Sequence, residues 1–240
     1  MTFSNFTFKA RLIPVLPFLF FEAWRIKRRS PRLMPVSEWV NLGQGDQSIL
    51  ILGESTAAGV GASHISTSIS GQLNQLLDSQ YIIQNIGKNG LKVSQVKRLL
   101  LNFSADIKKP SKGILLFIGA NDCFQLTSPT EFQKELSGLI GFFETELKPE
   151  WIYLADIPPV QLFPAFSPLM KFFLKRQRSF LQEKMKFLAH HNQKIIFEKI
   201  SIDLTSDFFS VDQIHPSDLG YQKISEFAIN QLNSRNLFGQ

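Results

Sequence analysis

This chain of 240 residues contains little cysteine and carries little net charge. The one cysteine, Cys123, excludes an intrachain disulfide framework and a zinc site built from several cysteines. The formal net charge is +6, and residues 1–33 account for all of it with seven basic residues and one acidic residue. The rest of the chain is balanced, so it lacks the clustered positive charge of a nucleic-acid-binding surface, and we expect no nucleic-acid partner.

A membrane-spanning apolar run is also missing. Residues 12–21 are apolar, but Pro14 and Pro17 interrupt the run and Glu22 ends it. A bilayer-spanning helix needs ~20 predominantly apolar residues, so this segment is too short. A signal peptide would continue into small residues and a cleavage site, whereas a basic stretch follows here, so we expect the segment to remain uncleaved.

Residues 1–34 therefore form a basic and hydrophobic N-terminal arm that has two interpretations. Its phenylalanines and leucines, Trp24 and the basic flank fit a segment at a membrane interface, with residues 9–33 touching an anionic membrane surface. Alternatively, the arm packs on the protein's own surface. We accordingly expect either a membrane-associated protein or a cytoplasmic one.

From residue 47 onward, five short apolar runs alternate with longer amphipathic segments. Unbroken apolar runs of this length are typical of strands buried on both faces. The alternation predicts an α/β fold, a three-layer α/β/α sandwich around a five-stranded parallel sheet. The predicted strands are 48–52, 81–86, 114–118, 151–155 and 194–197, and the predicted helices are 68–79, 93–104, 129–147, 170–190 and 218–233.

The predicted helix over 170–190 has a basic side opposite its apolar stripe. The side comprises Lys171, Lys175, Arg178 and Lys186. A solvated face is the ordinary explanation of such a pattern, and a second contact with an anionic membrane is the alternative.

Polar residues and glycines follow several of the predicted strands. Ser55 comes directly after the first strand, Asn121 after the third, and the second runs into a glycine-containing segment over 85–90. Asp212 and His215 lie in the loop before the last helix. The carboxyl ends of parallel strands share one edge of the sheet, so these groups are expected to converge there.

Together these residue types are suited to acyl transfer. A serine at the start of the segment after a strand can act as a nucleophile, and its own N–H can face a developing oxyanion. A glycine can present a bare N–H, and an asparagine amide can donate to the same oxyanion. An aspartate three residues before a histidine can hold the imidazole Nδ1–H and leave Nε2 to act as a base.

The four blocks GEST, NIGKNG, GAND and DQIHP resemble those of the SGNH hydrolase family, the GDSL-type esterases and lipases, over nearly all of residues 48–230. The resemblance implies a flavodoxin-like domain over 35–240 and a serine esterase that needs no cofactor and no metal. It implies a catalytic triad of Ser55, Asp212 and His215, and an oxyanion hole of Ser55, Gly90 and Asn121. The sequence departs from the family's usual Gly-Asp-Ser at Glu54. The acid is not the nucleophile, so we expect Glu54 to affect the turn that aims Ser55 without removing the chemistry.

The loop after the fourth predicted strand bears on the substrate. Leu162, Phe163 and Phe166 in this loop are expected to line a pocket for an apolar acyl chain, which favours a small-molecule or lipid ester. These side chains could instead cover the sheet's edge or pack against the arm. Two further alternatives remain open at this point: a deacetylase of sugar esters, and a catalytically silent, membrane-associated binding protein of the same fold. Nucleotide binding is disfavoured because the loop over 53–61 lacks the phosphate-binding glycine motifs.

Overall fold

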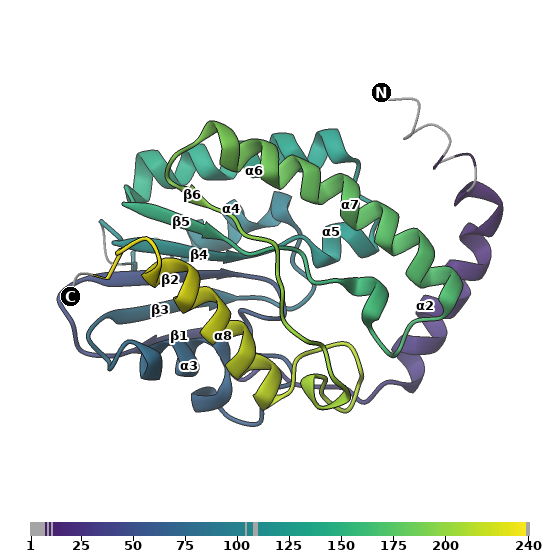
Figure 1. The fold of residues 1–240 in the computed structure, drawn as a ribbon, viewed down its shortest axis with the longest axis horizontal. Helices are drawn as coiled ribbons and strands as arrows, with labels where there is room; N and C mark the ends of the chain where they lie inside the picture. The colour runs from purple at the N-terminus through teal and green to yellow at the C-terminus, as the bar shows by residue number, and fades with distance from the viewer. Residues whose placement is uncertain (1–7, 9, 11, 104, 108–109, 239–240) are drawn as a thin grey trace.

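The computed structural model describes residues 8, 10, 12–103, 105–107 and 110–238. Within them the chain forms one six-stranded sheet, in the order β1-β3-β2-β4-β5-β6 (Figure 1). The strands are β1 (Trp39–Leu42), β2 (Ser48–Gly53), β3 (Ile82–Gly87), β4 (Gly113–Phe117), β5 (Trp151–Leu154) and β6 (Ile195–Ile196).

The five predicted parallel strands are confirmed, and their order, second-first-third-fourth-fifth, is that of flavodoxin-like sheets. The expectation of five strands in all is wrong, because β1 adds an antiparallel sixth along β3, with Trp39 opposite Ile86. This edge strand has four residues of mixed burial, too short for a recognisable apolar run.

Alternate residues of the five parallel strands pack into two separate cores. Leu50 and Leu52 of β2 face one core, whereas Ile49 and Ile51 face the other. The helices that cover the first face are α4 (Val93–Asn102), α6 (Pro129–Phe142) and α7 (Pro168–His191), and those on the second are α3 (Ile69–Leu76) and α8 (Asp218–Asn233). Burial on both faces explains why the central strands read as unbroken apolar runs.

The remaining elements are short apart from one helix near the N-terminus. That helix, α2 (Leu16–Arg29), was not predicted from the sequence. The short elements are η1 (Ile13–Val15), η2 (Ile65–Thr67), α5 (Ala120–Phe124), the π-helical turn η3 (Phe143–Leu147), η4 (Val160–Leu162) and η5 (Ser206–Phe208). Among the described residues, no helix combines the length and hydropathy that crossing a bilayer requires.

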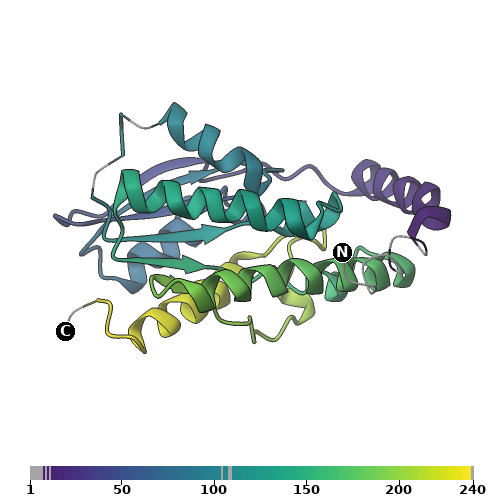
Figure 2. The same ribbon diagram turned by 90° about the horizontal axis from the view of Figure 1, so that it is seen from above.

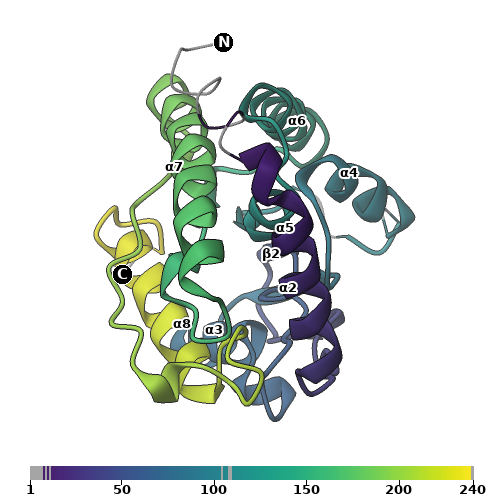
Figure 3. The ribbon, with the colours of Figure 1, turned by 90° about the vertical axis from the view of Figure 1, so that its right-hand side faces the viewer.

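Helix α2 lies beyond the carboxyl ends of the strands. Figure 2 shows it past the end of the sheet, and Figure 3 shows it running beside α7. One side of the arm packs on α7, where the Phe8 ring lies 5.5 Å from the Phe180 ring and Leu12 is buried. Lys9 and Arg11, which belong to the predicted membrane-contact segment, lie outside the described residues.

Candidate active site

Ser55 is placed by a close approach between β2 and β4. Gly53 has a φ of +152°, and a Cβ atom there would lie 2.0 Å from the Phe117 carbonyl oxygen. The next residue, Glu54, donates its N–H to that oxygen at 2.9 Å. A helical turn follows, in which the Ala58 N–H donates to the Glu54 carbonyl at 2.9 Å. Glycine is therefore required at position 53 to bring the Ser55 turn against β4.

Asp212 and His215 form a preorganised pair in the loop before α8. His215 Nδ1 lies 2.5 Å from Asp212 Oδ2, and the backbone N–H groups of Ile214 and His215 each donate to Oδ1 at 3.0 Å. Burial alone would raise the pKa of Asp212, but the hydrogen bonds from His215 and Ile214 outweigh it and hold that pKa below its usual value. The ionised carboxylate keeps the imidazole proton on Nδ1, which leaves Nε2 as the basic nitrogen.

Ser55, Asn121 and His215 line the same cavity, which has a volume of about 270 Å³. Within the described part of the chain, the Ser55 hydroxyl makes no hydrogen bond, either with His215 or with any other residue. The three groups come from the end of β2, the start of α5 and the loop before α8. The fold thus brings together residues that are far apart in the sequence, as the strand-end argument predicts.

Glu54 holds Asn121 in place. One carboxylate oxygen accepts the Ala120 N–H at 2.8 Å, and the other accepts the Asn121 N–H at 2.9 Å and the Asn121 Nδ2–H at 2.5 Å. Since Nδ2 carries two hydrogens, one remains for an oxyanion. The sequence predicts an effect of Glu54 on the serine turn, whereas in the structure its carboxylate binds the start of α5.

Gly90 lies in the turn between β3 and α4. Its φ of +80° is one that glycine adopts without strain, and its N–H donates no hydrogen bond among the described residues. Gly90 is not among the residues that line the cavity of Ser55, whereas its neighbour Asn89, which the sequence analysis does not predict as a site residue, is. Gly87 has a different role, because a Cβ there would lie 2.2 Å from the Ala58 nitrogen in the turn after Ser55.

Comparison with known protein families gives a match over most of the chain. The model of the GDSL-like lipase/acylhydrolase family matches residues 51–223. The chain belongs to this family. A search of curated proteins by sequence gave no match.

Solved structures share the fold of this GDSL-like hydrolase at low sequence identity. A carbohydrate acetylesterase family member from Sinorhizobium meliloti is 19% identical with a TM-score of 0.60, and the match covers 81% of this chain and 100% of that one. The psychrotrophic esterase EstA from Pseudoalteromonas sp. is 17% identical with a TM-score of 0.60, over 79% and 98% of the two chains. The aryl esterase of M. smegmatis is 16% identical with a TM-score of 0.59, over 78% and 99%.

Of the three residues predicted to line a pocket in the loop after β5, only Phe163 lines the cavity of Ser55 in this hydrolase. Phe163 lines the cavity that holds Ser55, and Phe166 lines a second cavity beside it. Leu162 is 54% exposed and lies outside the linings of both. The walls around Ser55 are mostly apolar and include Phe117, Ile118, Phe124, Ile200, Leu204, Phe208 and Phe227.

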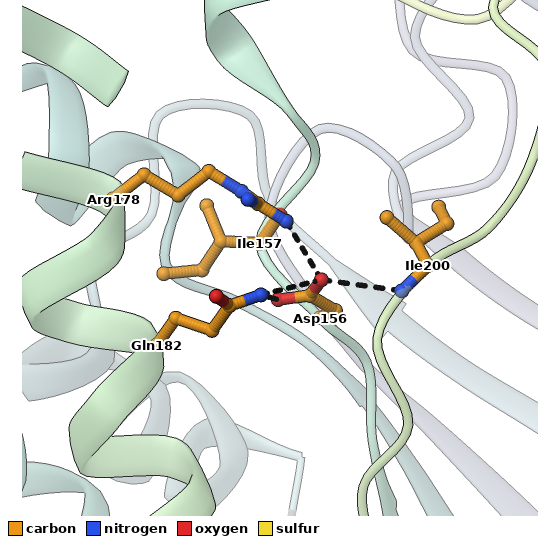
Figure 4. Close-up of polar contacts among 5 residues, drawn as sticks. All are labelled: Asp156, Ile157, Arg178, Gln182 and Ile200. Atoms are coloured by element: carbon orange, nitrogen blue, oxygen red, sulfur yellow. Dashed lines mark hydrogen bonds and ion pairs between the residues drawn. The ribbon is translucent and has the colours of Figure 1, made fainter. Parts of the chain in front are cut away.

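A buried polar network ties the same loop to α7 (Figure 4). Asp156 accepts Arg178 Nη2 at 2.7 Å, Gln182 Nε2 at 2.8 Å and the Ile200 N–H at 3.2 Å, while Arg178 Nε donates to the Ile157 carbonyl at 2.6 Å. Arg178 therefore does not belong to the solvated basic side predicted for α7. The network fixes one wall of the cavity, since Asp156 and Ile200 both line it.

The structure also predicts how Glu54 makes stability depend on pH. Glu54 is 4% exposed, and burial raises the pKa of its carboxyl to about 7, against the lowering effect of the Asn121 and Ala120 hydrogen bonds. Between the unfolded pKa of 4.5 and about 7, the folded state binds more protons than the unfolded state. The free energy of unfolding contributed by Glu54 therefore falls as pH rises, by about 3 kcal/mol across this window.

Glu54→Gln should remove that contribution. Urea unfolding between pH 4.5 and 7.5 should show a wild-type stability that falls relative to the variant as pH rises. Glu146→Gln, at an exposed glutamate, serves as the control and should follow the wild type. If the free energy of unfolding changes with pH in the same way in the wild type and in Glu54→Gln, the raised pKa does not belong to Glu54.

Proposed function

We propose that this hydrolase is a serine esterase that cleaves carboxylic esters of apolar acyl groups through an acyl-enzyme on Ser55. The observation that carries the proposal is the shared cavity of Ser55, Asn121 and His215, with His215 held by Asp212. Intact nucleophile, base and orienting carboxylate argue against a silent binding protein of the same fold.

In the proposed mechanism, Ser55 Oγ attacks the ester carbonyl and passes its proton to His215 Nε2. The C–O bond to the alcohol then breaks, and the alcohol leaves with the proton from His215. Water attacks the acyl-enzyme with His215 again as base, which releases the acid and restores Ser55. Donors for the oxyanion are the N–H groups of Ser55 and Gly90 and the free Nδ2–H of Asn121. No cofactor or metal takes part.

The walls of the cavity favour an acyl chain over a bare acetyl group. Aromatic and branched aliphatic side chains surround Ser55, including Phe117, Phe124, Phe163 and Ile214. An acyl chain of several carbons would displace water from these walls and gain ~0.8 kcal/mol per buried methylene group. The similarity to a carbohydrate acetylesterase family member makes the sugar-acetate substrate the alternative to test.

A fluorophosphonate probe and an ester series test the proposal on the wild-type protein. We expect covalent labelling of the peptide that contains Ser55, and kcat/KM for p-nitrophenyl esters that rises from acetate to longer acyl chains. Highest activity on acetylated sugars would favour the deacetylase instead. Absence of both labelling and ester hydrolysis would favour the silent binding protein.

We also propose that α2 contacts an anionic membrane surface. The face of α2 that does not pack on the domain carries Phe18, Phe20, Phe21 and Trp24, which are 50–69% exposed. Three arginines lie on the same helix, and Arg28 stacks over the Trp24 ring at 4.7 Å. Exposed aromatic rings beside basic residues suit the headgroup region of anionic lipid. The two interpretations of the arm are therefore compatible, because they concern opposite sides of it.

Liposome flotation tests the membrane proposal. The wild type should float with vesicles containing anionic lipid, and replacing Phe18, Phe20, Phe21 and Trp24 with serine should abolish flotation. Leu101→Ser, which removes an exposed apolar side chain on α4, should have no effect. Equal flotation of the wild type and the fourfold variant would refute the proposal.

A further inference from the structure

A second cavity separates α2 from the catalytic loop. It has a volume of about 680 Å³, within the range of small-molecule sites. One wall comes from the end of α2 and the segment that follows it, and the other from α7 and the loop of Asp212 and His215. Its lining includes Ile26, Lys27, Arg32, Leu33, Phe166, Met170 and Leu174.

The two cavities meet at His215. Asn89, Phe124, Ile214 and His215 line both cavities, whereas Ser55 and Asn121 line only the first. A leaving alcohol takes its proton from His215, so it departs on the side that the general acid faces. With Ser55 and Asn121 in the first cavity and His215 where the two meet, a bound ester would place its acyl group in the first cavity and its alcohol in the second.

The second cavity differs from the first in charge. Lys27 and Arg32 line the second, and the lining of the first contains no lysine or arginine. Within the described part of the chain, neither Lys27 nor Arg32 forms an ion pair. Asp212 also lines the second cavity, but its oxygens are engaged by His215 and by two backbone N–H groups.

We propose that the second cavity binds the alcohol moiety of the substrate, and that Lys27 and Arg32 select an alcohol that carries an anionic group such as a phosphate. The inference rests on the proposed esterase function, because it assigns the two halves of an ester to the two cavities. Apolar lining around the two cations indicates an amphiphilic alcohol rather than a small, fully polar one. Helix α2 and the segment that follows it thereby supply substrate recognition to a site whose catalytic groups all lie outside them.

A matched pair of soluble substrates tests this selection. 1-Octanoylglycerol and 1-octanoylglycerol 3-phosphate differ only by the phosphate, and both are used below their aggregation concentration. Release of octanoate gives kcat and KM without vesicles, so attraction of α2 to a charged membrane cannot produce a preference. We expect the phosphate ester to have a kcat/KM about tenfold higher, the ratio that ~1.4 kcal/mol supplies.

The variants Lys27→Gln and Arg32→Gln, made singly and together, test whether these two residues cause the preference for the phosphate ester. The double variant should lose it mainly through a higher KM for the phosphate ester, while its kinetics on 1-octanoylglycerol stay within about threefold of wild type. Arg28→Gln is the matched control, since it removes one charge from α2 at a residue that lines neither cavity.

The outcomes separate this inference from the esterase proposal. Hydrolysis of 1-octanoylglycerol with no preference for the phosphate ester would overturn the inference and leave the esterase intact. A preference that survives in the double variant, or that Arg28→Gln also abolishes, would overturn it as well. Failure of the wild type to cleave any ester or to react with the fluorophosphonate probe would instead overturn the esterase proposal.

Discussion

Ser55→Ala should lower kcat/KM for p-nitrophenyl esters by at least ~10⁴-fold, because no acyl-enzyme can form. The remaining rate would come from the oxyanion donors and from substrate binding, which the substitution leaves in place. The variant should also fail to react with the fluorophosphonate probe. Initial rates and labelling, measured on the same preparations, check both expectations.

The substitution should leave the fold intact, which makes the result interpretable. Ser55 makes no side-chain hydrogen bond among the described residues, so its loss should change the free energy of unfolding by no more than ~0.5 kcal/mol. Thr56→Val is the matched control, since Thr56 lines the same cavity and carries the adjacent hydroxyl. Full activity in Ser55→Ala, or inactivation of Thr56→Val alone, would assign the nucleophile elsewhere.

The parts of the fold that sequence predicts are those with a local signal. Ile49 to Leu52 read as one apolar run because α4 and α6 cover one side of β2 and α3 covers the other. The strand ends carry Ser55 and Asn121, and the sheet itself brings them to one edge. No folding detail beyond strand order is needed for that convergence, so it was predictable.

The role of Glu54 could not be predicted from the sequence. Its role depends on a contact with Ala120 and Asn121, more than sixty residues away, that exists only when β2 and β4 are paired. A buried acid directly after an apolar strand was the available signal, since such a group must find donors. Which donors it finds is a property of the tertiary structure.

The N-terminal arm shows a different limit. An amphipathic pattern indicates that one face of a segment is apolar, but it does not indicate what covers that face. Phe8 and Leu12 pack against α7, whereas Phe20 on α2 stays exposed. Lys27 and Arg32 line a cavity that His215 also lines because of this packing, so no motif in the arm could have linked them to the site.

Asp212→Asn should lower kcat by ~10⁴-fold while leaving the loop nearly unchanged. An asparagine oxygen can replace Oδ1 and accept the Ile214 and His215 N–H groups, both now at 3.0 Å. Its amide NH₂ then faces His215 Nδ1, which must become an acceptor, and the ring proton moves to Nε2. The imidazole can no longer take the proton of Ser55. Flipping the amide would set its NH₂ against two backbone donors, so the inactive arrangement is the stable one.

Steady-state kinetics at neutral pH measure this effect, because the hydrogen bonds from His215 and Ile214 outweigh burial and hold the pKa of Asp212 below its usual value. Asp218→Asn is the matched control: Asp218 lies three residues beyond His215 and binds the Ser63 N–H at 2.8 Å instead of the imidazole. It should keep activity within severalfold of wild type. If Asp212→Asn retains a tenth of the wild-type rate, or if Asp218→Asn loses as much, the carboxylate does not act by fixing the tautomer of His215. A selective loss at Asp212 would show that the hydrogen bond at 2.5 Å is what makes His215 a base.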